Sequence, residues 1–134
     1  MITITKEFTF GAAHRLQRPD LSESRNRDIY GKCCALHGHT YRLQVCISGE
    51  IDASGMILHF SDLKQLVKEK IIARYDHSLL NDLPEYRDCP TTAENIVWHI
   101  FTVLEPNLKN KNVTLESITL FETPTSWATF SKNA

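Results

Sequence analysis

The chain has 134 residues, 42% of them hydrophobic and 23% charged, with 5 glycines and 5 prolines. A chain of this length and composition can bury a core of its own, so we expect a single domain over residues 1–134 and exclude a disordered or fibrous protein. Its 15 basic and 16 acidic residues give a net charge of -1, which argues against a nucleic-acid partner held by bulk charge, although a local basic cluster could hold a phosphorylated small molecule.

The sequence predicts a cytoplasmic protein without a membrane partner. No apolar run approaches the ~20 residues that a bilayer span needs, and the N-terminal residues alternate rather than form a signal-peptide core. In a reducing compartment the 4 cysteines predict no disulfide framework, so each thiol is a packing group, a metal ligand or a nucleophile.

The first predicted element is a strand over residues 2–14. Apolar side chains recur there at even spacing and share one face: Ile2, Ile4, Phe8 and Phe10. Residues 16–32 are polar and basic, and we expect a loop, of a length that in compact domains is usually functional or disordered. The same alternation predicts a second strand over residues 40–48.

Two helices are predicted in the middle of the chain. Ser61 is a candidate cap for the first, and apolar residues follow it at helical spacing. The second begins at a capping box formed by Thr91 and Glu94 and is expected to end at Pro106 and Asn107.

Two last strands are predicted over residues 113–121 and 126–130, which gives the order ββααββ. Strands at both ends with helices between them indicate an α+β fold, in which a four-stranded antiparallel sheet carries both helices on one face. Such a sheet has two open edges, which favour pairing with another subunit and hence a homo-oligomer.

A pair of histidines with one glycine between them is the most informative chemical motif. On an extended backbone His37 and His39 project to the same side and can chelate zinc, although histidines on a solvated strand face share this spacing. His14, in an apolar context at the end of the first strand, is the best third ligand, whereas His59 and His99 are poorer candidates. Three histidines and an open position are the composition of a catalytic zinc site.

Cys33 is a candidate base or nucleophile. It lies four residues before His37 and next to Lys32, so a metal and an ammonium group would favour its thiolate. A fourth zinc ligand or a buried inert thiol are the alternatives, and Cys34 could compete for either role.

Two further candidates contain carboxylates. The carboxylate of Asp76 could orient the neighbouring imidazole of His77 and favour its charged form, as in a general acid or base. Most Asp-His pairs, however, lie on the protein surface by chance and have no function. Glu122 ends an apolar strand, and its two oxygens match the N–H and amino pair of a guanine-like ring. A solvated strand end is the alternative.

Taken together, these residues resemble a known family, the 6-pyruvoyl-tetrahydropterin synthase superfamily. Motifs in the family's order extend over nearly the whole chain: Phe10–Leu16, Gly31–Cys33, Leu36–Tyr41, Asp76–His77, Pro90–Asn95 and Phe121–Thr123. The resemblance implies the tunnelling fold, or T-fold, a unit of two strands, two helices and two strands. These units assemble through sheet edges, commonly into a hexamer of two trimers.

The resemblance also implies a substrate, 7,8-dihydroneopterin triphosphate, and three groups of site residues that meet at subunit interfaces in the family. They are the zinc ligands His14, His37 and His39, the proton-transfer residues Cys33, Asp76 and His77, and the pterin-binding residues Glu122, Thr91 and Thr92.

Two branches of the family differ in the spacer between the cysteine and the His-Gly-His motif. The short spacer between Cys33 and His37 is typical of the bacterial 6-carboxy-tetrahydropterin synthases of the queuosine pathway, whereas the 6-pyruvoyl synthases of biopterin synthesis have a longer one. The long segment that ends at residues 30–33 is more similar to the second branch, and Cys34 departs from the glycine usual in the first.

We give the spacer more weight, because it fixes the distance from the thiolate to the metal. The expected enzyme is a zinc-dependent lyase that forms 6-carboxytetrahydropterin with loss of acetaldehyde and triphosphate. A 6-pyruvoyl-tetrahydropterin synthase is the alternative, and a non-catalytic zinc- or pterin-binding module is an alternative of a different class.

Overall fold

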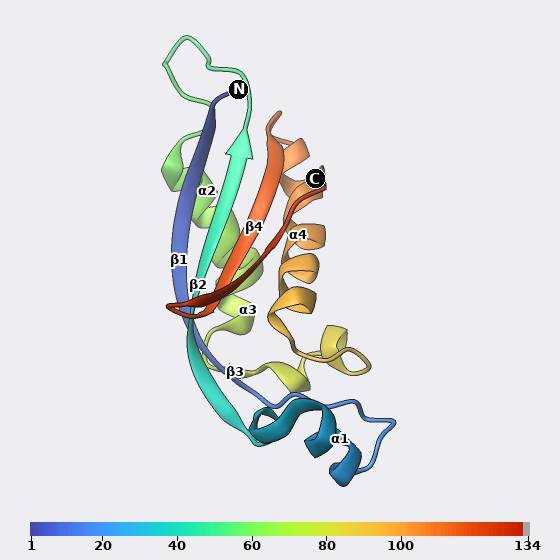
Figure 1. Ribbon diagram of the computed structural model, residues 1–134. Helices are drawn as coiled ribbons and strands as arrows, with labels where there is room; N and C mark the ends of the chain where they lie inside the picture. The colour runs from blue at the N-terminus through green and yellow to red at the C-terminus, as the bar shows by residue number, and fades with distance from the viewer. Residues whose placement is uncertain (133–134) are drawn as a thin grey trace.

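The computed structural model describes residues 1–132 and contains one mixed sheet with helices packed against it (Figure 1). Residues 133–134, the last two of the predicted domain, lie outside the described residues. The strands are β1 (Thr3–His14), β2 (His37–Ser48), β3 (Ser78–Leu79), β4 (Thr114–Thr123) and β5 (Ser126–Phe130). The α-helices are α1 (Glu23–Tyr30), α2 (Phe60–Val67), α3 (Ala73–Tyr75) and α4 (Ala93–Lys109).

The sheet has five strands in the order β3-β1-β2-β4-β5, so the predicted four-stranded antiparallel sheet is wrong in its detail. The four longer strands are antiparallel to their neighbours, but β3 pairs in parallel with Ala12 and Ala13 of β1. A strand of two residues is too short to show a periodicity, and for this reason the sequence pattern does not reveal β3.

The core lies between one face of the sheet and the helices α2 and α4, which Figure 1 shows on the same side of it. Alternating residues of the long strands supply the sheet side of this core, as the period of two in their sequence predicts. The fully buried members with the largest side chains are Phe10, Tyr41, Leu43, Ile47, Leu63, Ile71, Tyr75, Leu80, Ile96, Ile100, Phe101 and Leu104.

The predicted loop over residues 16–32 contains a helix, α1, followed by a 3-10 turn over Gly31–Cys34. The Ser22 side chain caps α1 by accepting from the N–H of Arg25 at 3.2 Å. Because most of its side chains are polar and exposed, α1 has no apolar stripe, and a helix without a stripe gives no signal in the hydrophobic pattern.

The ends of the two helices that the sequence predicts also differ from the expectation. His59 caps α2 in place of Ser61, and Thr92 caps α4 in place of Thr91. Helix α4 continues through Pro106 to Lys109, because a proline in the last turn removes one backbone hydrogen bond while Leu108 still packs in the core. Within residues 1–132 no helix has the length and apolarity required to cross a bilayer.

Candidate metal centre

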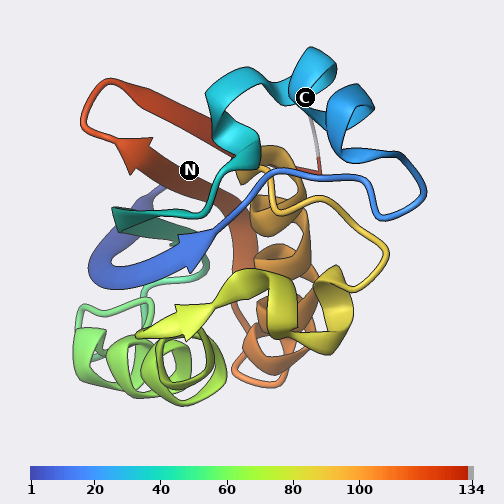
Figure 2. The same ribbon diagram turned by 90° about the horizontal axis from the view of Figure 1, so that it is seen from below.

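Three histidines meet where β1 ends and β2 begins, at the end of the sheet nearest to α1 (Figure 2). The antiparallel register places His14 opposite His37, and His39 lies two residues further along β2 on the same face. One ligand nitrogen from each ring lies within 4.8 Å of the other two. The structure thus confirms the predicted proximity of these three side chains.

Backbone carbonyls orient two of the three rings. His14 donates from Nδ1 to the carbonyl oxygen of Thr91 at 2.9 Å, and His37 donates from Nδ1 to that of Ala35 at 2.7 Å. A carbonyl oxygen only accepts, so Nδ1 carries the proton in both rings and Nε2 is the available ligand.

The ligand atoms of the cluster fit a bound cation. The Nε2 atoms of His14 and His37 lie 3.1 Å apart, and in two neutral rings with protonated Nδ1 atoms this brings two lone pairs face to face. Nε2 of His39 is buried without a hydrogen-bond partner among the described residues. A metal ion bound by the three nitrogens would satisfy all of them.

The surroundings favour the neutral imidazoles that a metal requires. His14 is 0% exposed, and this burial lowers its pKa, against the opposing effect of the hydrogen bond to Thr91. Burial likewise lowers the pKa of His39, whereas the nearby charge of Glu122 raises it.

Glu122, at the end of β4, reaches the edge of the cluster. Its Oε1 lies 3.8 Å from Nε2 of His39, and its side chain is 29% exposed. Glu122 also lines a hollow together with Thr92, the N-cap residue of α4. A ligand in this hollow would therefore touch a carboxylate beside the histidines.

The structure places Thr91 behind the three histidines. The residue is 0% exposed, its hydroxyl donates to the carbonyl oxygen of Arg15 at 3.3 Å, and its own carbonyl orients His14. The carbonyls of Thr91 and Ala35 are functional groups that sequence reasoning missed, because a contact through a backbone carbonyl leaves no signal in residue type.

Cys33 lies outside the group of three ligand atoms. It is half-buried in the 3-10 turn before β2, and its carbonyl oxygen accepts from the N–H of Leu16 at 2.9 Å. Neither Cys33 nor Cys34 belongs to the metal-ligating group found among the described residues.

Asp76 and His77 form a hydrogen-bonded pair at the outer edge of the sheet, next to β3. Nδ1 of His77 lies 3.0 Å from Oδ2 of Asp76, and Oδ1 of Asp76 accepts from the N–H of Gly11 at 2.9 Å. The hydrogen bond from Gly11, followed by that from His77, lowers the pKa of Asp76. The hydrogen bonds of this pair thus go to each other and to β1, and the structure does not join them to Cys33.

His77 combines high exposure with an unusual backbone. Its side chain is 89% exposed, and its φ of 60° lies in the left-handed region, which a residue with a side chain seldom adopts. Its N–H donates to the carbonyl oxygen of Gly11 at 2.6 Å, which ties this conformation to β1.

The chain is similar to pterin synthases in sequence and in structure. The family model for 6-pyruvoyl tetrahydropterin synthase matches residues 3–133. The 6-pyruvoyl tetrahydrobiopterin synthase of Dictyostelium discoideum is 40% identical over 81% of this chain and 82% of its own length. The 6-carboxy-5,6,7,8-tetrahydropterin synthase of Haemophilus influenzae is 36% identical over 98% of this chain and 100% of its own.

Among solved structures, the 6-pyruvoyl tetrahydropterin synthase of Caenorhabditis elegans superimposes with a TM-score of 0.90 and 30% identity. The superposition covers 98% of this chain and 96% of that one.

Proposed function

Because the chain belongs to the 6-pyruvoyl tetrahydropterin synthase family, we propose that it is a zinc-dependent lyase acting on 7,8-dihydroneopterin triphosphate. The proposed products are 6-carboxytetrahydropterin, acetaldehyde and triphosphate, with uptake of one water, as a step of queuosine biosynthesis. The observation that carries the proposal is the cluster of three convergent histidines with the Glu122 carboxylate 3.8 Å from one of them.

The histidine cluster would hold the metal. His14, His37 and His39 supply three nitrogens, which leaves a position for substrate, as in catalytic zinc sites. When bound, zinc would lower the pKa of a substrate hydroxyl and polarise an adjacent carbonyl.

Glu122 would anchor the pterin ring beside this centre. A carboxylate that accepts from both the ring N–H and the amino group forms a bidentate, charge-assisted contact, which fixes the ring and hence the position of its side chain. Thr92 lines the same hollow and would assist it.

Cys33, Asp76 and His77 would move the protons. The Cys33 thiolate would take a proton from the side-chain carbon next to the ring, and triphosphate would then leave from the far end of the side chain. Asp76 holds Nδ1 of His77, so the other ring nitrogen can exchange protons with the substrate oxygens. The left-handed backbone of His77 supports a functional role, since residues held in rare conformations cluster at active sites.

The placement of these residues favours an assembly of several chains. Within residues 1–132, β5 has an unpaired outer edge, and so does β1 apart from the two residues that pair with β3. His77 is exposed close to this β1 edge. Pairing of these edges between copies would bring His77 of one chain to the β5 edge of another, which lines the hollow that contains Glu122. We therefore include in the proposal a homo-oligomer, a hexamer built from two trimers.

The short spacer between Cys33 and His37 supports the 6-carboxy product. A 6-pyruvoyl product is the second candidate, favoured by the names of the Dictyostelium relative and of the Caenorhabditis structure. A non-catalytic zinc module would need a closed fourth ligand, whereas the group found among the described residues has three.

Product analysis tests the proposal. Zinc-loaded protein is incubated with 7,8-dihydroneopterin triphosphate, and triphosphate, acetaldehyde and the pterin product are quantified, with Cys33→Ala as the control. Release of acetaldehyde and triphosphate in equal amounts supports the 6-carboxy synthase. Release of triphosphate alone supports the 6-pyruvoyl synthase, and release of neither from zinc-loaded protein contradicts both enzymes.

A further inference from the structure

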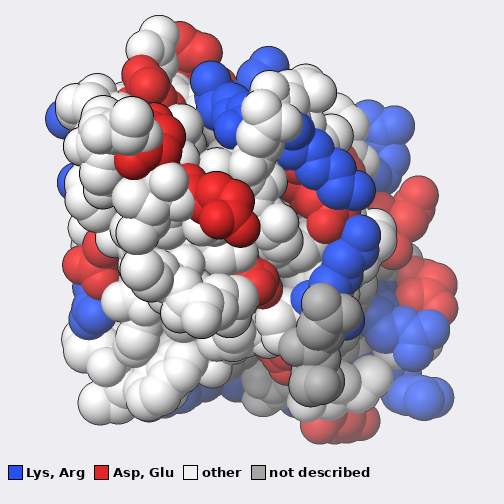
Figure 3. All heavy atoms as spheres, turned by 90° about the horizontal axis from the view of Figure 1, so that it is seen from above, with Lys and Arg blue, Asp and Glu red and all other residues white. Residues whose placement is uncertain are grey.

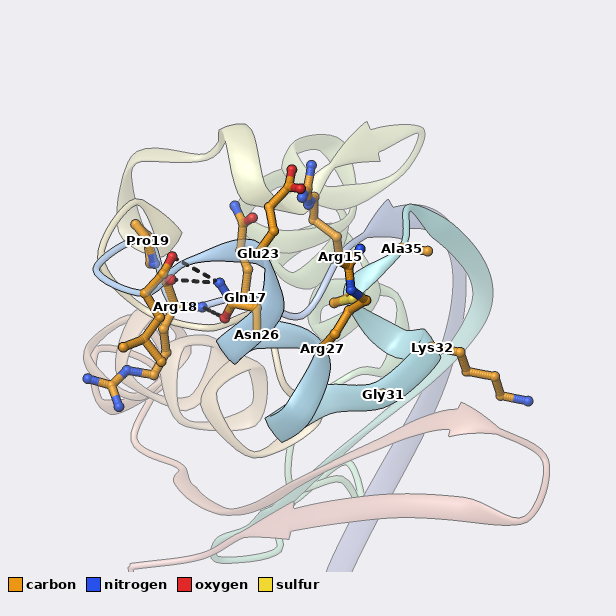
Figure 4. A pocket seen from close by; sticks show the side chains of 12 residues that line it. Arg15, Gln17, Arg18, Pro19, Glu23, Asn26, Arg27, Gly31, Lys32 and Ala35 are labelled. Carbon is orange, nitrogen blue, oxygen red and sulfur yellow. Dashed lines mark hydrogen bonds between the residues drawn. The ribbon is translucent and has the colours of Figure 1, made fainter.

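A second hollow, of about 580 Å³, lies next to the metal centre in the segment between β1 and β2 (Figure 4). Its volume is in the range of small-molecule sites. The loop after β1, helix α1 and the 3-10 turn supply its lining: Arg15, Gln17, Arg18, Pro19, Leu21, Glu23, Asn26, Arg27, Gly31, Lys32, Cys34 and Ala35.

A buried asparagine builds the wall of this hollow. Asn26 is 7% exposed, and its Oδ1 accepts from the N–H of Arg18 at 2.8 Å. Its amide group donates to the carbonyl oxygens of Arg18, Leu21 and Ser22 at 3.1, 3.3 and 3.2 Å. These bonds fasten the loop to α1, so the hollow is a fixed part of the fold.

The lining is strongly basic in a chain that is almost neutral. Arg18 is paired with Asp20 at 2.7 Å, but Arg15, Arg27 and Lys32 form no ion pair with a carboxylate among the described residues. Glu23 is the one acidic residue of the lining. At the opposite end of the molecule, by contrast, acidic and basic side chains share the surface (Figure 3).

The three basic side chains without an ion pair among the described residues, Arg15, Arg27 and Lys32, point in different directions (Figure 4). Figure 4 shows the Arg27 side chain extending from α1 towards Arg15, whereas Lys32 extends outward at the rim. Arg15 and Arg27 therefore form the basic centre of the hollow, and Lys32 forms its edge.

The hollow and the metal centre share their supporting residues. Arg15 directly follows His14, and its backbone is held on both sides by Asn81, whose Oδ1 accepts from its N–H and whose Nδ2 donates to its carbonyl, each at 2.9 Å. Ala35 lines the hollow and orients His37 through its carbonyl. Residues within two positions of His14 and of His37 therefore also line the hollow.

We propose that this hollow binds the polyphosphate tail of the substrate, with Arg27 and Arg15 as its main contacts. The identity of the substrate rests on the function proposed above. Planar guanidinium groups match phosphate oxygens in bidentate geometry, and a chain of linked phosphates carries the several negative charges that three unpaired cations attract. A polyphosphate tail bound in this hollow lies beside the three histidines. The pterin ring can then occupy the separate hollow that contains Glu122.

The test compares Arg27→Gln with the matched control Arg25→Gln, which removes the same charge from the same helix outside the hollow. Both side chains are exposed, so neither change empties the core. Binding of inorganic tripolyphosphate to zinc-loaded protein is measured by calorimetry, with zinc content checked after each titration because polyphosphates chelate zinc. Binding of phosphate-free 7,8-dihydroneopterin and turnover of its triphosphate are measured in parallel.

Arg27→Gln is expected to weaken tripolyphosphate binding and to raise KM for the triphosphate substrate by about tenfold, the loss typical of one charge-assisted contact. Its kcat and its affinity for 7,8-dihydroneopterin are expected to stay unchanged, and Arg25→Gln should behave as the unmodified protein. Unchanged tripolyphosphate binding in Arg27→Gln overturns the site, and an equal loss in Arg25→Gln assigns the effect to diffuse surface charge.

The design separates this proposal from the proposed function. If the protein turns over the pterin triphosphate but Arg27→Gln leaves KM unchanged, the tail site is wrong and the enzyme assignment stands. If Arg27→Gln weakens tripolyphosphate binding but no pterin triphosphate is turned over, the anion site stands and its assignment to this substrate is overturned.

Discussion

Replacing Glu122 by Gln tests whether this carboxylate anchors a pterin. The side chain keeps its shape, but one acceptor becomes a donor, so the ring would present a donor to an NH₂ group. A mismatched polar contact of this kind costs about 1–3 kcal/mol, which corresponds to a roughly tenfold to hundredfold loss of affinity. Because the Glu122 side chain is 29% exposed, water can reach the mismatched groups, and we expect a loss near the tenfold end.

The assay is calorimetric titration of zinc-loaded protein with phosphate-free 7,8-dihydroneopterin, which keeps the polyphosphate contacts out of the measurement. Zinc content is measured alongside and should be unchanged, because the three imidazoles remain. Glu116→Gln, on the same strand but in a separate depression near the N-terminus, controls for the loss of one negative charge. Equal pterin affinity in Glu122→Gln and in the unmodified protein would refute the anchor.

Four further substitutions test the proposed metal centre, the thiols and the electrostatics of the fold. His14→Ala should lower zinc content sharply, because two imidazoles rarely retain the ion against competition, and full zinc occupancy by metal analysis would exclude His14 as a ligand. Cys33→Ala should abolish turnover with zinc retained, while Cys34→Ala keeps most activity; loss of zinc from Cys33→Ala would identify a ligand instead. Glu85→Gln should lower the free energy of unfolding at neutral pH by ~0.5–1 kcal/mol, because hydrogen bonds from Arg74 lower the pKa of Glu85. That stabilisation is complete above the unfolded-state pKa of ~4.3 and is lost as the pH falls through the lower folded-state pKa. The difference in urea unfolding between Glu85→Gln and the unmodified protein should therefore shrink as the pH is lowered below ~4.3, and a difference independent of pH would contradict the ion pair.

The long strands and the histidine cluster were predictable from the sequence, because both depend on a period of two. Alternation placed the core residues of β1 and β2 on one face, and the same rule placed His37 and His39 on one side of β2. His14 joins them through the antiparallel register, which follows once β1 and β2 are taken as neighbours.

The remaining features depend on contacts that leave no pattern in the sequence. Helix α1 is held by the Ser22 cap and by the buried Asn26, and its outward faces are polar. The β3 pairing has two residues in register and is adjoined by hydrogen bonds between Asp76–His77 and Gly11. The support of His14 by Thr91 uses a carbonyl that any residue type would offer.

The position of His14 and His37 would let a bound metal ion stabilise the segment between them. Residues 15–36 leave the sheet after His14 and return at His37, and this excursion carries both the basic hollow and Cys33. A metal bound to both histidines acts as a cross-link across the base of a long loop, which reduces the conformational freedom of the open loop. Chelation should therefore increase amide hydrogen exchange within this excursion before it affects the paired centre of the sheet. The availability of one metal ion would therefore control how well ordered the polyphosphate contacts and the Cys33 thiol are, although neither group needs to contact the ion.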